Sequence, residues 1–277
     1  IAGPEAPDSV ASCGFSGTLQ QSSVPAIGPN GEVYVVWQFG PTFTDVTSTN
    51  AEIRVARSLN GGVSFNTSVT VASINSMRQN PPVGYNRNRI NDHPRIAVAT
   101  SGPRKGRVFV SFTSAVSPVS ARSTVQSLVS SQVFVKFSDD RGLTWSSAVP
   151  VAPAPPSTGL KRWWPVVSFD PEGGVDVVYY ESQEKSIGTT CNRGGRSGPA
   201  VSLVDTFLAQ SQNGGATFGA PVKISSATSN WCTTVSNIQP NFGDYIGSGG
   251  TEERLFPVWA DGRNGVPDTF AAPVKTD

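Results

Sequence analysis

The fold of this protein is decided by an eight-residue stretch, Ser138-Asp139-Asp140-Arg141-Gly142-Leu143-Thr144-Trp145. Weaker copies of it are Ser58-Leu59-Asn60-Gly61-Gly62-Val63-Ser64-Phe65 and Ser211-Gln212-Asn213-Gly214-Gly215-Ala216-Thr217-Phe218. The shared frame is Ser-x-Asp/Asn-x-Gly-x-Ser/Thr-aromatic, in which the Asp or Asn accepts backbone N–H bonds and Gly supplies a positive φ angle. Three copies of one turn predict a repeat architecture.

Short apolar strands are expected around each turn. A second strand of each unit is expected at 33–37, 108–112, 175–180 and 255–259, a third at 53–57, 133–137 and 206–210, and a fourth at 69–72, 149–152 and 222–224. These runs are rich in Val, Phe and Tyr and are separated by turn residues, so the sequence predicts an all-β fold.

Proline marks a further repeat. Pro25, Pro94, Pro165 and Pro240 each precede an apolar run, and successive prolines are 69, 71 and 75 residues apart. The first residue of a strand is one of the few positions in a sheet that tolerates proline. We therefore expect each proline to open the first strand of a unit, which gives units near 21–75, 90–152, 162–226 and 237–277.

The turn frame resembles the Asp-box of the sialidase-like (BNR repeat) β-propellers. The match is complete at 138–145, and the other copies have Asn60 or Asn213 in place of Asp140 and Phe in place of Trp. The resemblance implies four-stranded antiparallel blades with the box, a structural element, between the third and fourth strands. It implies a single propeller domain over residues 1–277. Because the fourth unit has no box, two readings stay open: a closed four-bladed propeller, or part of a six- or seven-bladed one.

Composition excludes several classes of protein. The net charge of +1 gives no support for nucleic-acid binding, and no apolar run is long enough to span a membrane. A composition low in Lys and rich in Ser, Thr, Asn and Gly favours an extracellular, secreted or cell-surface protein. Cys191 and Cys232 lie in loops expected on the same side of neighbouring units and are predicted to form a disulfide, leaving Cys13 over. The three cysteines lack metal-ligand spacing, so neither a metal nor a cofactor is expected.

The long connections should all emerge at the end of the blades opposite the boxes, where repeat proteins commonly bind ligands. This face carries ten basic and five acidic residues: Arg78, Arg87, Arg89, Arg122, Lys161, Arg162, Lys185, Arg193, Arg196 and Arg263 against Asp45, Asp92, Glu181, Glu184 and Asp261. Guanidinium groups pair with carboxylates and aromatic rings stack on sugars, so an anionic glycan is the ligand class that fits. An ordinary solvated loop surface is the alternative.

The resemblance to sialidases implies specific site residues. Arg89 or Arg95, Arg162 and Arg263 would bind the substrate carboxylate, with Trp163 beside them. Asp92 would be the acid, Glu181 the activator and Tyr245 the nucleophile, an exception to the usual pair of carboxylates. The Phe/Tyr-Arg-Ile-Pro motif of that family is reduced here to Arg95-Ile96 without the following Pro. His93, the only histidine, is expected to be a turn or packing residue.

Two functions follow as hypotheses. One is a secreted glycoside hydrolase of exo-sialidase type that acts on an anionic glycan. The other is a non-catalytic propeller that binds a glycan, a glycoconjugate or a protein partner, or that completes a larger propeller. Convergence of three arginines beside a Tyr–Glu pair would favour hydrolysis, and dispersed arginines would favour binding.

Overall fold

The computed structural model describes residues 20–40, 50–85, 92–119, 128–155, 158–170, 172–184, 191, 201–235, 245–251 and 253–275. These residues form strands and connections, with a single 3-10 turn, η1 (Met77–Gln79). None of the helical structure in these ranges has the length and apolar character needed to cross a membrane.

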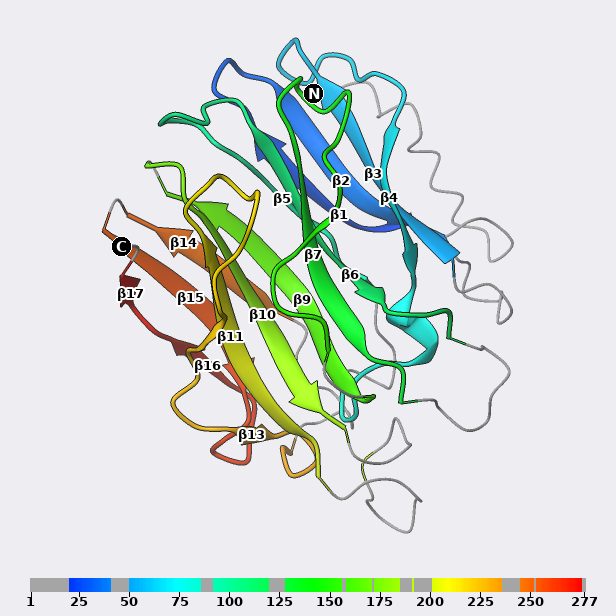
Figure 1. Ribbon diagram of the computed structural model, residues 1–277, viewed down its shortest axis with the longest axis vertical. Coiled ribbons are helices and arrows are strands. Elements are labelled where there is room, and N and C mark those ends of the chain that lie inside the picture. Colours follow the sequence, from blue (N-terminus) through cyan, green and yellow to red (C-terminus); the bar gives the residue numbers. More distant parts are fainter. Residues whose placement is uncertain are drawn as a thin grey trace.

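The strands form four antiparallel sheets whose members follow the chain (Figure 1). The first sheet contains β1 (Gln20–Ile27), β2 (Val33–Phe39), β3 (Asn50–Ser58) and β4 (Val69–Asn75), and the second contains β5 (Arg95–Val98), β6 (Val108–Ala115), β7 (Ser131–Ser138) and β8 (Val149–Pro150). The third contains β9 (Leu160–Phe169), β10 (Val175–Gln183), β11 (Leu203–Ser211), β12 (Val222–Lys223) and β13 (Ser229–Asn230), and the fourth contains β14 (Ile246–Gly250), β15 (Arg254–Asp261), β16 (Asp268–Ala271) and β17 (Val274–Lys275). This order of strands is the one expected for propeller blades.

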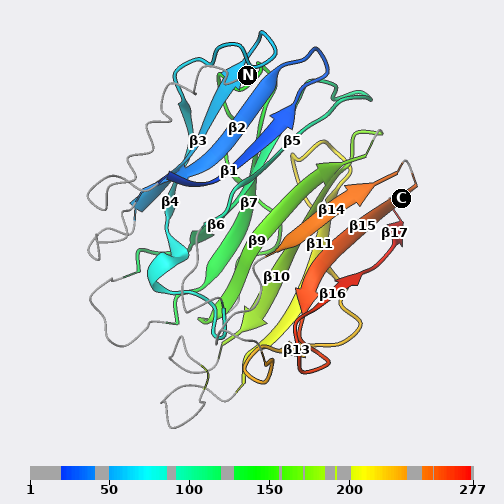
Figure 2. The ribbon, with the colours of Figure 1, turned by 180° about the vertical axis from the view of Figure 1, so that it is seen from behind.

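The first strand of each sheet is its innermost strand. Seen from behind, β1, β5, β9 and β14 lie next to one another in chain order, and successive pairs of them are in contact (Figure 2). Apolar side chains fill the space between successive sheets, with one core cluster between each pair. No comparable packing joins the first and fourth sheets in the described part of the chain, so closure of the ring is not seen.

The second, third and fourth strands expected from the sequence are confirmed in the first three sheets. The prediction for proline is wrong in two of them, because Pro25 lies inside β1 and Pro165 lies inside β9, while Pro94 directly precedes β5. Pro240 lies outside the described residues. An innermost strand pairs on one edge only, and both β1 and β9 have a bulge near the proline, so the missing N–H disrupts no regular ladder.

The fourth sheet differs from the others. β15 pairs with β14 along one edge and with β16 and then β17 along the other, because Leu255 faces both Gly250 and Val274. In the described residues, this sheet therefore has a third strand in two pieces and no outer strand beyond it.

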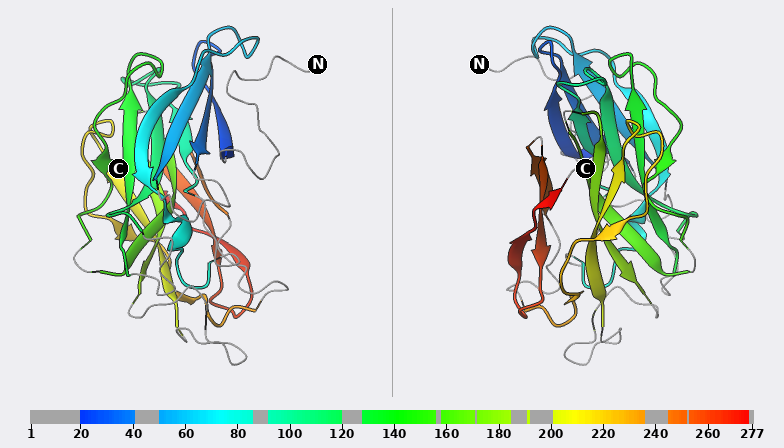
Figure 3. Two further views of the ribbon diagram at one scale, coloured as in Figure 1. Left: turned by 90° about the vertical axis from the view of Figure 1, so that its right-hand side faces the viewer. Right: turned by 60° about the vertical axis from the view of Figure 1, so that its left-hand side comes forward.

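The two ends of the sheets carry different connections. The tight hairpins that join third to fourth strands lie at the upper end in Figures 1 and 3, together with the turns from first to second strands. The 3-10 turn η1 and the segment around β13 lie at the lower end. We call these the box end and the long-connection end.

Candidate functional site

The three repeated turns that resemble the Asp-box share one hydrogen-bonding pattern. In the complete copy, the Asp140 carboxylate accepts from the backbone N–H of Thr144 at 2.9 Å and of Leu143 at 3.0 Å, and from the Thr144 hydroxyl. The Ser138 hydroxyl accepts from Gly142 N–H at 2.8 Å. Asn60 and Asn213 occupy the position of Asp140 and accept from the N–H of Ser64 and Thr217.

The ionised Asp140 suits this turn. Its slight burial opposes ionisation, but hydrogen bonds from Thr144, Ser138 and Leu143 outweigh that effect and hold the pKa of Asp140 well below its usual range. Gly142, with φ +81°, occupies a conformation that side chains resist. All donors to the Asp140 carboxylate come from its own turn, so this carboxylate serves to close a hairpin, whereas Arg57 of the first sheet donates to the Asp140 carbonyl oxygen.

The long-connection end is held by contacts between distant segments. Lys161 on β9 forms an ion pair with Glu184 after β10, with 2.7 Å between Nζ and Oε2. Lys161 also donates to Asn80 Oδ1 and Pro81 O, and Glu184 accepts from Val83 N at 2.7 Å. Burial lowers the pKa of Lys161 and raises that of Glu184, and their mutual attraction opposes both shifts.

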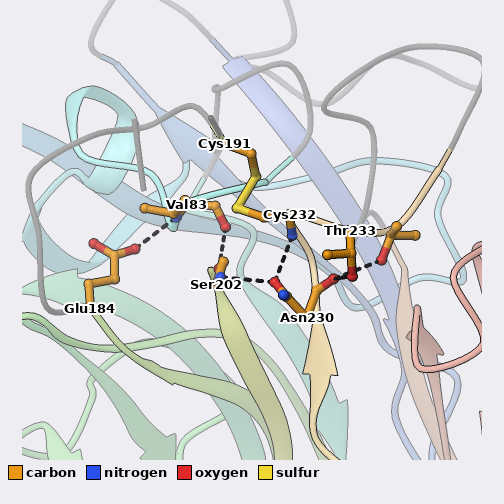
Figure 4. The surroundings of a disulfide bond; sticks show 8 residues. Val83, Glu184, Cys191, Ser202, Asn230, Cys232 and Thr233 are labelled. Carbon is orange, nitrogen blue, oxygen red and sulfur yellow. Dashed lines mark hydrogen bonds between the residues drawn. A yellow bond between two sulfur atoms is a disulfide. The ribbon is translucent and has the colours of Figure 1, made fainter. Parts of the chain in front are cut away.

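Beside this ion pair is the disulfide bond predicted from the sequence. Cys191 and Cys232 are bonded, 41 residues apart in the chain (Figure 4). Ser202 donates to Val83 O at 2.6 Å, and Asn230 Oδ1 accepts from the backbone N–H groups of Ser202 and Cys232. The hydrogen bonds of Val83 with Glu184 and Ser202 therefore fasten this segment to the third sheet, and Val83 packs against the disulfide.

Register identifies equivalent positions on the innermost strands. The box serines Ser58, Ser138 and Ser211 pair with the first residues of β2, β6 and β10. Three residues further along lie Val36, Ser111 and Val178, whose partners on the innermost strands are Val24, Arg95 and Val166. Two positions before these inner-strand partners, the equivalent residues are Ser22, His93 and Trp164. In the fourth sheet Gly247 pairs with Val258, and the corresponding residue is Tyr245.

These four equivalent residues, the inner-strand cluster, contact one another in succession. Ser22 Oγ lies 2.6 Å from His93 Nδ1. The His93 ring lies 4.2 Å from the Trp164 ring, centroid to centroid, and the Trp164 ring lies 6.3 Å from that of Tyr245. The cluster therefore joins the innermost strands of all four sheets through side chains.

Unusual backbone angles accompany the cluster. Ser22 has a φ angle of 62° and Trp164 one of 54°, although neither is glycine. Each sits at a bulge where two residues of the inner strand face one residue of the next strand. Strained positions of this kind are concentrated at functional sites.

Arg95 supplies the positive charge of the cluster. Its guanidinium lies 5.4 Å from the centre of the Trp164 ring and donates to Pro94 O. No carboxylate of the described residues pairs with it, and burial lowers the pKa of Arg95. Burial, and secondly the charge of Arg95, lowers the pKa of His93 to about 3, so the imidazole is neutral at neutral pH.

The other arginines expected in a carboxylate clamp are already paired. Arg162 Nε lies 2.6 Å from Glu181 Oε2, and Arg263 pairs with Asp261. Together with the Lys161–Glu184 pair, these pairs neutralise three of the four basic residues of the expected face that the structure describes. The other six lie outside the described residues: Arg87, Arg89, Arg122, Lys185, Arg193 and Arg196. Arg95 is thus the clamp candidate that the described structure leaves without an acidic partner.

The expected catalytic residues are not brought together. The Asp92 side chain is 1% exposed and accepts from Ser76 Oγ, Met77 N and Gln38 Nε2, and burial raises its pKa to about 6. Glu181 is engaged by Arg162, and within the described residues no hydrogen bond or ion pair joins it to Tyr245. The arrangement does not support acid and activator roles for Asp92 and Glu181, because both carboxylates already serve internal contacts.

The two aromatic residues expected in the site, Trp163 and Tyr245, differ in solvent exposure. Trp163 is fully buried and packs against Tyr180 and Trp231, which leaves no face for a sugar and argues against a substrate-binding role. Tyr245 is 80% exposed. From the sequence, Arg95 and Tyr245 were expected in the site and Trp164 was expected only among the aromatic residues of the same face, whereas Ser22 was missed and His93 was expected to be a turn or packing residue. Ser22 was missed because the repeated prolines align Val24, which precedes Pro25, with His93, which precedes Pro94.

Comparison with known proteins tests the fold. A Hadza microbial sialidase superposes with a TM-score of 0.55 at 11% identity, over 91% of this chain and 44% of its own. The chain has a β-propeller fold. It spans less than half the length of that sialidase.

Other solved structures are similar over most of this chain. An α-L-arabinanase of Penicillium chrysogenum, complexed with arabinobiose, gives a TM-score of 0.45 at 16% identity over 90% of this chain and 63% of its own. An intramolecular trans-sialidase from Ruminococcus gnavus gives 0.37 at 10% identity over 93% and 85%. No protein-family model matches the chain, and no curated protein is significantly similar to it.

Proposed function

We propose that the protein is an extracellular propeller that binds an anionic glycan at the inner-strand cluster. The observation that carries the proposal is the arrangement of Arg95, whose guanidinium lies over Trp164 and has no acidic partner among the described residues. A half-buried guanidinium of this kind is suited to a carboxylate or sulfate group.

Tyr245 adds the surface on which a sugar ring can lie. Its ring is exposed and is held at one side by the indole of Trp164, which also contacts Arg95. A sugar acid could therefore place its apolar face on Tyr245 and its anionic group on Arg95. The disulfide supports an extracellular location, because such bonds persist in oxidising compartments.

Binding is favoured over sialidase-type hydrolysis because the other candidate site residues are already engaged in ion pairs. Hydrolysis by the mechanism implied by the resemblance needs a Tyr–Glu pair and several free arginines, whereas Glu181, Arg162 and Arg263 are engaged in ion pairs. The exact sugar is not part of the proposal, which commits only to an anionic one.

The test compares sialyllactose with lactose by titration calorimetry, using the wild type, Arg95→Met and Arg254→Met. Arg254 is an exposed arginine of the fourth sheet, so Arg254→Met removes an equal charge outside the cluster. We expect sialyllactose to bind more tightly than lactose, and Arg95→Met to lose about tenfold or more in affinity while Arg254→Met does not. Equal binding of the two sugars, or no effect of Arg95→Met, would refute the proposal.

A further inference from the structure

The Ser22–His93 contact has the chemistry of a nucleophile and its base. Ser22 Oγ and His93 Nδ1 are 2.6 Å apart, within the range of a strong hydrogen bond. A neutral imidazole with its proton on Nε2 accepts the serine hydroxyl proton at Nδ1. A serine held by a base in this way is the usual form of an activated nucleophile.

The backbone supports this reading of Ser22. Its φ angle of 62° lies in the left-handed region, which a serine adopts at an energetic cost. The following residue, Ser23, is exposed and makes no contact with His93, whereas Ser22 is half-buried and points at the imidazole. The bulge therefore selects one of two adjacent serines and directs it toward the base.

The same site carries a positive charge that suits the reaction. Arg95 is near enough to His93 to oppose its protonation, in addition to the larger effect of burial. An anionic group bound to Arg95 would neutralise its charge and so raise the pKa of His93, which makes His93 a stronger base when substrate is present. The Arg95 charge would also favour the negative charge that develops on an attacked carbonyl oxygen.

We infer that Ser22 and His93 form a nucleophilic dyad that cleaves carboxylic esters, with an O-acylated anionic glycan as the substrate class. The choice of a glycan ester rests on the proposed function, whereas the ester chemistry itself rests on the dyad alone.

The reaction balances with water as the only co-substrate. Ser22 Oγ attacks the carbonyl carbon and passes its proton to His93 Nδ1. The bond from that carbon to the alcohol oxygen breaks, and the alcohol leaves with the proton from His93. Water then attacks the acylated Ser22, His93 accepts a proton from the water and returns it to Ser22 Oγ, and the carboxylic acid is released.

The first experiment treats the wild-type protein with a fluorophosphonate and locates the modified residue by mass spectrometry. We expect labelling of Ser22 and none of Ser23, and a rate lower by about 100-fold in His93→Gln. The choice of Ser22 over Ser23 is measured on the intact wild-type chain, so this part of the result does not depend on whether a variant folds. Absence of label at Ser22, or equal labelling of both serines, would overturn the dyad.

The second experiment measures acetate release from an O-acetylated sialoside and from p-nitrophenyl acetate. Ser22→Ala should abolish both activities, and the matched variant Ser23→Ala should keep both within about twofold. If Ser22 is labelled and cleaves p-nitrophenyl acetate but no sialoside binds, the dyad stands and the glycan proposal fails. If sialyllactose binds through Arg95 but neither ester is cleaved, the glycan proposal stands and the dyad fails.

Discussion

The box end and the long-connection end of this propeller are stabilised in different ways. At the box end, the Asp or Asn side chain of each turn accepts hydrogen bonds from residues at most four positions away, as between Asp140 and Thr144, and Arg57 and Arg107 add bonds to backbone carbonyls of the box in the next sheet. At the other end, Lys161 contacts Asn80 and Glu184 contacts Val83, which are 81 and 101 residues away. The comparison teaches that each repeated turn can close through its own side chains, with arginines added between neighbouring sheets, while the buried ion pair of the long-connection end exists only in the assembled fold.

The largest expected effect is at the long-connection end. Lys161→Met leaves the buried Glu184 carboxylate without its cation, and we expect a loss of about 3–5 kcal/mol in the free energy of unfolding. The measurement is urea denaturation at pH 7. The double variant Lys161→Met/Glu184→Gln should recover much of the loss.

A matched control sharpens this test. Lys223 and Asp205 form a pair at 2.9 Å in which the Lys223 side chain is 40% exposed, so Lys223→Met should cost no more than about 1 kcal/mol. Equal effects of Lys161→Met and Lys223→Met would show that the long-connection end does not depend on its buried pair.

The second effect concerns the disulfide. Replacing Cys191 and Cys232 together by Ala should lower the free energy of unfolding by about 2–4 kcal/mol, because the bond closes a chain segment of 41 residues. Thermal unfolding of the variant and of the reduced wild type should give similar midpoints. A midpoint unchanged from the oxidised wild type would mean that the ion pair and hydrogen bonds around Val83 hold this region alone.

The third prediction uses one buried carboxyl group near each end. Burial raises the pKa of Asp92 to about 6. Burial, with a smaller contribution from the charge of Asp170, also raises the pKa of Asp176 to about 6, although a hydrogen bond from Gln210 opposes the shift. Because each of these pKa values is higher in the folded than in the unfolded protein, the protonated carboxyl group contributes to the free energy of unfolding below about pH 4, and this contribution is lost as pH rises through about 6.

Asp176→Asn should therefore reduce this pH dependence by on the order of 2 kcal/mol between pH 4 and pH 7. Urea denaturation at several pH values gives the slope, with Glu253→Gln, an exposed carboxyl group just before β15, as the control. A slope unchanged by Asp176→Asn would contradict the assignment of this carboxyl group.

The smallest effect is expected within a single box. Asp140→Ala removes several local hydrogen bonds and should cost about 1–2 kcal/mol, and Asp140→Asn should cost less, because Asn60 and Asn213 already serve in the other boxes. Thermal unfolding of both variants measures the difference. If Asp140→Asn were as harmful as Asp140→Ala, the three boxes would not be equivalent.

Sequence by itself determined the features that depend on local order. The turn frame located the three box hairpins and the strands on either side of them, because an Asx side chain, a glycine and a short alternating strand act over a few residues. The bond between Cys191 and Cys232, 41 residues apart, was predicted correctly from the repeat, which placed both cysteines in loops on the same side of neighbouring units.

Only the tertiary structure decided which charged and reactive groups remain available. Arg95 and Arg162 look alike in sequence, yet Glu181 pairs with Arg162 and no described carboxylate pairs with Arg95. Ser22 and His93 are 71 residues apart and meet because one bulge shifts the register of β1. Charge neutralisation and register depend on partners distant in the chain, so composition and motif spacing carried no sign of either.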